Sequence, residues 1–150
     1  TYFIGQHKAD DAREIMEREN SVVDLEADQS HYEGLGDMSM VLQSMASSAY
    51  QTESEHLASL IEGQFSERAR RRSRGVKQAG FLVLWRASMP AVLVALGFLS
   101  NRNEARILAS EEGQALLASG LYPAIRNYKP RYEEGLSHAT TAPDHVAARD

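Results

Sequence analysis

The sequence contains no cysteine among its 150 residues. Disulfide bridges and thiol catalysis are therefore excluded, and a zinc ion could bind only to histidine, aspartate or glutamate. No apolar run approaches the length of a membrane span, so none is expected. Residues 1–4 lack an initial methionine and have neither the basic residues nor the long apolar segment of a secretory signal. We therefore expect a processed or excised piece of a longer protein.

Charge and composition are those of an ordinary globular protein. Apolar residues make up 43% of the chain and charged residues 25%, and the formal net charge is −5. A chain of this length forms one domain with a real hydrophobic core. The acidic balance argues against a nucleic-acid partner, and no aromatic residues alternate with the basic residues at 68–77. We interpret that basic run as the solvated end of a helix.

Apolar periodicity predicts alternating strands and helices. A β-prone segment at 1–4 ends at a glycine, and the solid apolar runs at 79–85 and 91–96 indicate strands buried on both faces. Pro130 is expected to stop the last helix. Helical spacing predicts helices at 11–26, 38–69, 101–109 and 110–128.

A strand, a long helical crossover and two further strands indicate an α/β fold, with a partial, mostly parallel central sheet flanked by helices. We assign residues 1–129 to this domain and residues 130–150, which carry few apolar groups, to a flexible carboxyl-terminal tail. Three strands are few for a buried sheet, so further sheet and helices are expected upstream of Thr1. Without them, the strand edges at 2–4 or 79–85 would stay uncovered, and the chain would self-associate.

Residues 89–101 form the most informative segment, in which a proline, the apolar run, a Gly-Phe pair and a Ser-Asn turn follow one another. Sites in open α/β sheets gather at the carboxyl ends of strands, so chemistry is expected near Gly97, Phe98, Ser100 and Asn101. Ser100 is not a nucleophile, because no Gly-x-Ser-x-Gly elbow surrounds it. Ser100 and Asn101 are better explained as a turn that caps the next helix.

This segment resembles the closing motif of zinc-dependent N-acetylmuramoyl-L-alanine amidases, Pro-x-Val-Leu-Val-Glu-x-Gly-Phe-(Ile/Leu)-Ser-Asn. The glutamate of that motif is the family's catalytic acid/base, and Ala95 stands at its position here. The chain thus resembles the carboxyl-terminal portion of the catalytic domain. Further similarity to the family covers residues 1–8, 18–22, 74–84 and 110–129.

The resemblance implies a bacterial hydrolase of the periplasm or cell envelope. Its substrate would be the amide between N-acetylmuramic acid and L-alanine in peptidoglycan, and one zinc ion would activate a water molecule. The family's ligands, two histidines and a glutamate, have no matching positions in this chain. Together with Ala95, this predicts a truncated, inactive form that binds no zinc by itself. Two alternatives stay open: a pseudoenzyme that regulates or binds the cell wall, and an interaction module whose incomplete sheet pairs with another chain.

The histidines form no pair at the i, i+4 spacing of a helical zinc motif, so we interpret them as solvated or partly packed. His7 is the most interesting, because the resemblance places it near the rim of the cleft as a candidate substrate contact. Glu19 interrupts an apolar helix face, and a boundary residue that reaches solvent explains it better than an anchor in the cleft. The histidines are His7, His31, His56, His138 and His145.

Overall fold

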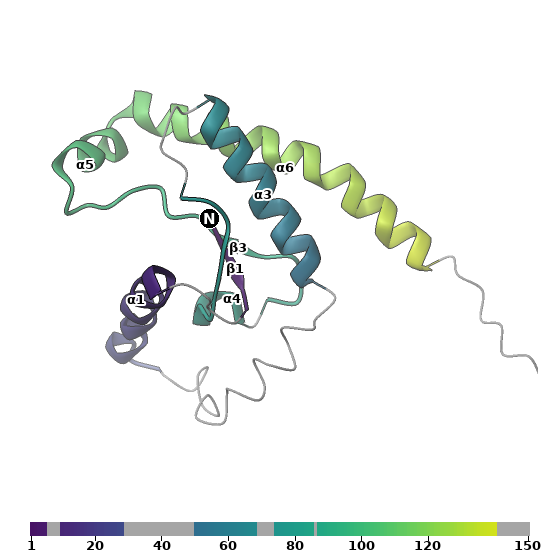
Figure 1. The fold of residues 1–150 in the computed structure, drawn as a ribbon, viewed down its shortest axis with the longest axis horizontal. Helices are drawn as coiled ribbons and strands as arrows, with labels where there is room; N and C mark the ends of the chain where they lie inside the picture. The colour runs from purple at the N-terminus through teal and green to yellow at the C-terminus, as the bar shows by residue number, and fades with distance from the viewer. Residues whose placement is uncertain (6–9, 29–49, 69–73, 86, 141–150) are drawn as a thin grey trace, which may run out of the picture.

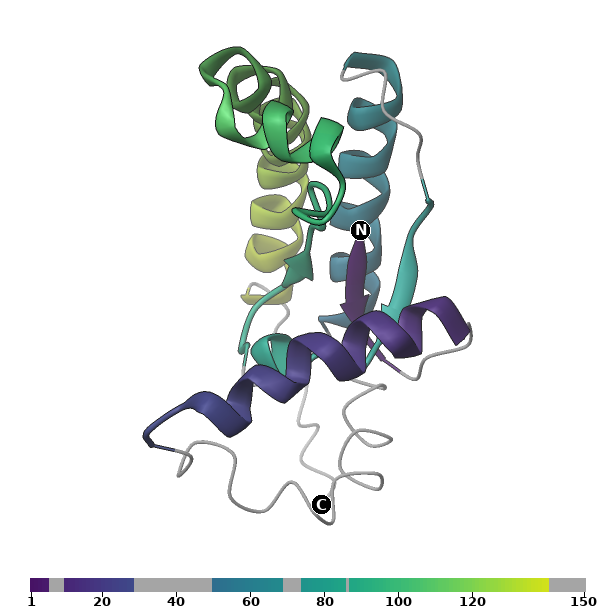
Figure 2. The ribbon, with the colours of Figure 1, turned by 90° about the vertical axis from the view of Figure 1, so that its left-hand side faces the viewer.

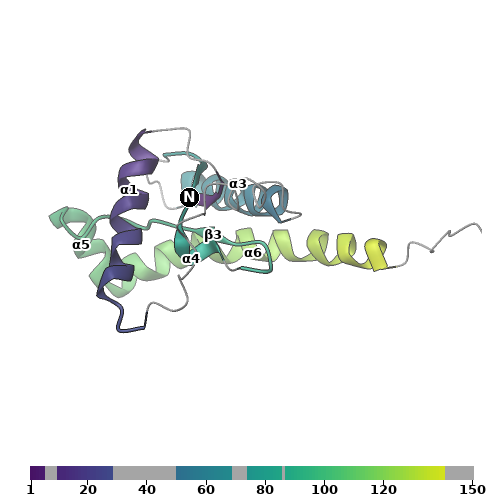
Figure 3. The same cartoon turned by 90° about the horizontal axis from the view of Figure 1, so that it is seen from below.

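The computed structural model describes residues 1–5, 10–28, 50–68, 74–85 and 87–140 (Figure 1). Its elements are β1 (Tyr2–Ile4), α1 (Asp10–Asn20), the 3-10 helix η1 (Ser21–Leu25), α3 (Gln51–Arg68), β2 (Lys77–Ala79), α4 (Leu82–Trp85), β3 (Val92–Leu93), α5 (Arg102–Ala109) and α6 (Glu111–Thr140). A small sheet lies between α1 on one side and the pair of α3 and α6 on the other (Figure 2, Figure 3). This arrangement confirms the α/β class.

The sheet is mixed rather than mostly parallel. Its strand order is β2-β1-β3, with β1 parallel to β2 and antiparallel to β3. The long connection through α1 and α3 allows the parallel pairing, whereas the short connection at 80–91 turns the chain back. Because β1 is the central strand, the expected uncovered edge at 2–4 is wrong. Self-association through the remaining edges stays a prediction.

The prediction of a strand at 79–85 is wrong beyond Ala79, because β2 ends there and α4 follows. The side chain of Asn20 explains the change. Its Nδ2 donates to the Gly80 carbonyl at 2.9 Å, and its Oδ1 accepts from the Leu82 amide at 3.0 Å. These backbone groups are the ones that a longer strand would need for its ladder. The side chain of Phe81, between them, is fully buried.

The strand expected at 91–96 is also shorter, since β3 contains Val92 and Leu93. Both are half-buried, so the expectation of burial on both faces is wrong. The pairing with β1 stops where Tyr2 lies opposite Leu93. Just before β3, the Ala91 amide donates to the Ser54 hydroxyl of α3 at 3.0 Å. Residues 94–98 then leave the sheet without a strand partner among the described residues.

The long helices α3 and α6 pack against each other (Figure 1). Of the helix predicted at 38–69, the part before residue 50 lies outside the described residues. The stop predicted at Pro130 is wrong, because α6 runs through Pro123 and Pro130 to Thr140. A proline removes its own amide donor but not those that follow, so flanking hydrogen bonds can carry the helix on. The assignment of a separate tail from residue 130 stays a prediction, and residues 141–150 lie outside the described part.

Two hydrophobic clusters hold these layers together. The sheet cluster lies between α1 and the sheet, where the Tyr2 and Phe81 rings meet edge to face at a centroid distance of 5.1 Å. The helix cluster lies between α3 and α6, and the half-buried side chains of β3 and the segment after it pack onto it. The sheet cluster comprises Tyr2, Ala12, Ala79, Phe81 and Leu84, and the helix cluster comprises Ile61, Phe65, Leu117 and Ala124.

Candidate functional site

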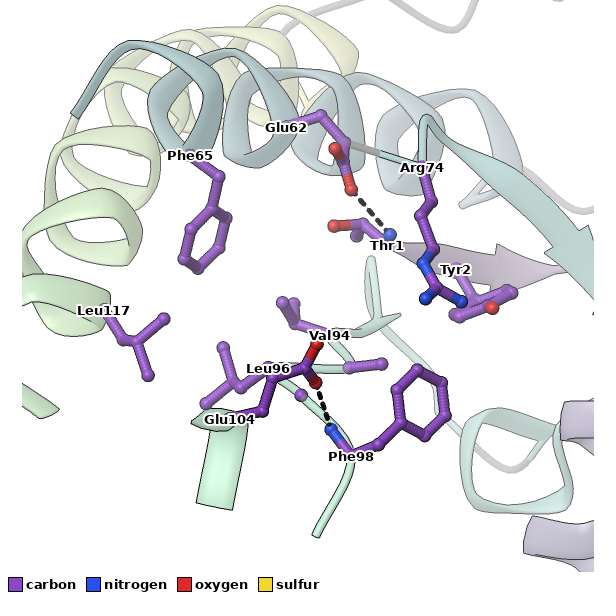
Figure 4. A pocket seen from close by; sticks show the side chains of 12 residues that line it. Thr1, Tyr2, Glu62, Phe65, Arg74, Val94, Leu96, Phe98, Glu104 and Leu117 are labelled. Carbon is purple, nitrogen blue, oxygen red and sulfur yellow. Dashed lines mark hydrogen bonds and ion pairs between the residues drawn. The ribbon is translucent and has the colours of Figure 1, made fainter. Parts of the chain in front are cut away.

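A cavity of about 210 Å³ lies where the chain leaves β3 (Figure 4). Its floor is the segment at 94–98, and Ala95, Gly97 and Phe98 all line it. The Ala95 side chain is exposed toward this space. We call it the strand-end pocket. Three of the residues selected from the sequence are therefore brought together, whereas Ser100 and Asn101 do not line this pocket.

Asn101 and Glu104 fix the far side of the strand-end pocket. Asn101 caps α5 as the sequence predicted, because its Oδ1 accepts from the amides of Asn103 at 3.0 Å and Glu104 at 3.3 Å. The Glu104 carboxylate reaches back and accepts from the Phe98 amide at 2.6 Å. One capping motif thus starts a helix and also holds the Gly97–Phe98 turn in place.

The guanidinium group of Arg74 also belongs to the wall of the strand-end pocket. Arg74 stands before the left-handed turn at Gly75, whose φ is 76°, and its guanidinium carbon lies 5.0 Å from the centroid of the Phe98 ring. The contact is a cation–π interaction, and Phe98 is in turn held by Glu104. The other basic residues at 69–73 lie outside the described part.

Polar and apolar groups divide the rest of the wall (Figure 4). From α3, Glu62 accepts from the backbone nitrogen of Thr1 at 2.7 Å. The Thr1 hydroxyl is buried and has no hydrogen-bond partner among the described residues. The side chains of Phe65 and Leu117, from the helix cluster, line the apolar side. The strand-end pocket can therefore hold a small ligand with charged, hydrogen-bonding and apolar parts, but Ala95 itself cannot transfer a proton.

The remaining sequence candidates lie elsewhere. His56 is on α3, and its Nε2 lies 3.1 Å from a guanidinium nitrogen of Arg131 on α6. Glu19 is exposed, in agreement with the interpretation of a boundary residue, and its neighbour Asn20 makes the anchoring contacts. His7, His31 and His145 lie outside the described residues, as does the side chain of His138.

The same helix pair carries a second polar cluster, toward the end of α3 opposite the strand-end pocket. Tyr128 is buried, and its ring stacks on Tyr132 at 5.5 Å. Burial and the neighbouring carboxylate of Glu53 raise the pKa of the Tyr128 phenol well above its usual range. The Tyr128 ring also lies 6.1 Å from the His56 ring of α3, centroid to centroid, so we interpret this cluster as packing between the two helices.

Comparison with known proteins identifies the class. The model of the N-acetylmuramoyl-L-alanine amidase family matches residues 8–127. The chain belongs to this family.

Within the described residues, no helix has both the length and the apolar character that crossing a membrane requires. No solved structure matches the chain.

Two relatives from Bacillus show how much of a larger protein is matched. The uncharacterised protein YqiI of Bacillus subtilis (strain 168) is 40% identical over 75 residues, which are 50% of this chain and 36% of YqiI. An uncharacterised cell wall amidase of Bacillus anthracis is 34% identical over 82 residues, which are 55% of this chain and 15% of the relative. The chain therefore spans a minor part of the relatives that it matches.

The family's zinc does not fit the groups found in the strand-end pocket. A catalytic zinc needs three protein ligands, commonly histidines with a carboxylate. Among the described residues, no group of three or more histidine, aspartate or glutamate side chains could hold a metal ion. The carboxylates that line this pocket, Glu62 and Glu104, both accept hydrogen bonds from the backbone. The contacts described for Glu62 and Glu104 therefore position the segments around this pocket.

Sequence reasoning selected Ala95, Gly97 and Phe98 but missed the other residues that line the strand-end pocket. Those with polar side chains include Thr1, Glu62, Arg74 and Glu104. Glu104 lies in the helix predicted at 101–109, but its bond to Phe98 depends on the fold of the turn. Glu62 breaks the apolar stripe of α3 next to Ile61, and that break is a signal the sequence does carry. Arg74 was counted only as one charge of a basic run.

Proposed function

We propose that this chain forms one wall of a peptidoglycan amidase site, which receives the bond between N-acetylmuramic acid and L-alanine. The observation that carries the proposal is the place of Ala95. It lines the strand-end pocket directly after β3, and the family's motif has its acid/base glutamate at this position. Family membership supports the substrate class, and the cell envelope of a bacterium is the location where such a substrate is found.

As it stands, the chain binds peptidoglycan without cleaving it. An acid/base group contributes typically ~10²–10⁴-fold to a hydrolysis, and alanine has no proton to give or accept. The ligand set for zinc is also missing from the described residues. What the chain's own residues supply is a shaped pocket, in which Phe98 is positioned by Glu104 and an apolar side is provided by Phe65. We therefore infer that this part of an amidase does not catalyse the hydrolysis with the residues described.

The alternative is a pseudoenzyme that binds the cell wall and regulates other proteins there. One observation favours it: the turn after β3 keeps its hydrogen bond to Glu104 and its contact with Arg74, although position 95 is alanine. A binding pocket can thus persist without the catalytic group. Both forms of the proposal predict binding, and they differ only in what the intact parent protein does.

The test uses purified peptidoglycan sacculi and the full chain. Co-sedimentation measures binding, and chemical labelling of newly freed L-alanine amino groups measures cleavage in the same sample. The chain should sediment with sacculi but not with chitin, and it should expose no new L-alanine amino groups. Ala95→Trp places a large side chain in the strand-end pocket and should abolish sedimentation. Ala115→Trp, at an exposed position of α6 outside this pocket, is the matched control and should sediment normally.

Three results would contradict the proposal. Failure of the chain to sediment with sacculi would remove peptidoglycan as its ligand. Equal loss of binding in both tryptophan variants, with unchanged circular dichroism spectra, would place the binding surface away from Ala95. New L-alanine amino groups exposed by the chain would show that it is an active hydrolase and that Ala95 does not disable it.

A further inference from the structure

Arg74 differs from the arginines for which the structure describes a polar partner, and among the described residues that line the strand-end pocket it supplies the guanidinium. Arg13 and Arg18 on α1 lie near glutamates of their own helix at 3.9 Å, and Arg68 on α3 donates to Gln64 at 2.7 Å. Arg74 has no hydrogen bond or ion pair to any described residue, and its described contact is the Phe98 ring. Its five N–H donors are thus available at the mouth of the strand-end pocket.

The guanidinium is nevertheless held in a defined position. The Phe98 ring beneath it is fixed through the short bond from the Phe98 amide to Glu104. Stacking on an aromatic ring leaves the edge of the guanidinium free to bind a planar anion with two parallel hydrogen bonds. A side chain that is placed in advance loses less conformational entropy when the ligand binds.

A second unused group lines the same cavity. The hydroxyl of Thr1 is buried and has no hydrogen-bond partner among the described residues. A buried polar atom without a partner destabilises a protein by about 1–3 kcal/mol, so a ligand that supplies the missing hydrogen bond is favoured. The guanidinium of Arg74 and this hydroxyl belong to segments far apart in the sequence, but both face one cavity (Figure 4).

We propose that Arg74 and the Thr1 hydroxyl form a subsite for a carboxylate group of the peptidoglycan stem peptide. The proposal rests on the proposed function and names the part of the substrate that enters the strand-end pocket. The cavity of about 210 Å³ is smaller than the ~300–1,000 Å³ that encloses a whole drug-sized ligand, so it takes one end of a longer molecule.

Charge decides between a peptide carboxylate and a phosphate. Two carboxylates, from Glu62 and Glu104, line the same cavity as Arg74. Glu62 forms an ion pair with the amino-terminal nitrogen of Thr1 at 2.7 Å, and the two carboxylates still disfavour a doubly charged phosphate more than a singly charged carboxylate. A peptide also brings amide N–H groups, which can donate to carboxylate oxygens beside the guanidinium. The lining therefore favours a peptide end that carries one carboxylate.

The experiment compares two synthetic peptides by isothermal titration calorimetry with the full chain. One is L-Ala-γ-D-Glu-L-Lys, and the other is the same peptide with its carboxyl groups amidated. The wild-type chain should bind the acid more tightly than the amide by about 10-fold, near the lower end for a charged hydrogen bond because Arg74 is exposed. Arg74→Ala should bind both peptides equally weakly, and Arg74→Lys should keep part of the preference.

Arg126→Ala is the matched control. Arg126 also lies over an aromatic ring, 5.9 Å from the centroid of Tyr122, but on α6 outside the strand-end pocket. This variant should keep the full preference for the acid. Sedimentation with sacculi, measured in parallel, separates the two proposals, because it reports the proposed function without the subsite.

Several outcomes overturn the subsite. They are equal binding of acid and amide by the wild-type chain, an undiminished preference in Arg74→Ala, and displacement of the peptide by an equal concentration of inorganic phosphate. A chain that sediments with sacculi but binds neither peptide would also refute it, while leaving the proposed function standing. Loss of sedimentation in the wild-type chain would refute both.

Discussion

The two hydrophobic clusters of this protein are assembled in different ways. The helix cluster joins two long helices, α3 and α6, that pack against each other. The sheet cluster instead collects single residues from β1, α1, β2, α4 and the turn before α4. The strand-end pocket takes its apolar side from the helix cluster and its floor from the chain leaving the sheet. Its shape therefore depends on both clusters being in place.

The two regions also differ in what their polar groups do. Inside the helix pair, the polar groups of Glu53 and Tyr128 are buried beside each other and contribute to packing. Where the sheet ends, backbone that has no strand partner is held by side chains instead, as Glu104 holds Phe98. Such segments can present functional groups, because their backbone is not committed to a ladder. The comparison explains why the candidate site lies at the end of β3.

The largest expected effect comes from the sheet cluster. Phe81→Ala removes a fully buried ring that contacts Tyr2, and it should lower the free energy of unfolding by about 3–5 kcal/mol. Val83→Ala, two residues on and 72% exposed, should change it by less than about 0.5 kcal/mol. Urea denaturation followed by circular dichroism measures both. Similar small effects for the two variants would mean that the sheet cluster does not stabilise the fold.

A smaller effect is expected from the side chain that shortens β2. Asn20→Ala removes the bonds to Gly80 and Leu82 and should destabilise the chain by about 1–3 kcal/mol. Asn127→Ala, exposed on α6, is the control and should be nearly neutral. Amide hydrogen exchange at Leu82 should also become faster in Asn20→Ala. Unchanged exchange there would show that Asn20 does not hold the turn between β2 and α4.

The smallest effect concerns the helix pair at high pH. The pKa of the Tyr128 phenol is raised in the folded state, so the folded chain keeps a proton that the unfolded chain loses above its ordinary pKa of about 10. The free energy of unfolding should therefore be unaffected below pH 10 and fall above it, by up to ~1.4 kcal/mol per pH unit.

Tyr128→Phe should remove this part of the pH dependence, whereas Tyr122→Phe, at a residue 66% exposed, should keep it. Denaturant unfolding at pH 9, 10 and 11 provides the comparison. An equal slope in wild type and Tyr128→Phe would show that burial of this phenol is not linked to stability.

Local features were predictable from the sequence, and pairing between distant segments was not. The cap of α5 by Asn101 and that of α6 by Ser110, whose hydroxyl accepts from the Gly113 amide at 3.1 Å, follow from neighbouring residues. The length of a strand, in contrast, depends on how much of the neighbouring strand it can pair with. The run at 91–96 is apolar enough for a long strand, but β1 offers only a short edge. Likewise, no local pattern reveals that Asn20 takes the backbone groups after Ala79.

Some residues of the candidate site were likewise predictable from a local motif, and others were not. Ala95, Gly97 and Phe98 were found because they follow one another in a recognisable motif, and the structure places them around one cavity. Glu62 and Thr1 reach this cavity only through the packing of α3 against β1. The helix continuing past Pro130 was missed because a proline usually ends a helix, and its sequence neighbours do not indicate an exception.

The central claim is that the strand-end pocket, with Ala95 in its wall, is where peptidoglycan binds. Nuclear magnetic resonance of the ¹⁵N-labelled chain, titrated with soluble N-acetylmuramoyl-L-alanyl-D-glutamate, tests it directly. The amide signals of Ala95, Gly97 and Phe98 should shift in a saturable manner, whereas those of Leu136 and Ser137, near the distant end of α6, should not. Saturable shifts confined to the distant end of α6, or no saturable shifts at all, would contradict the account.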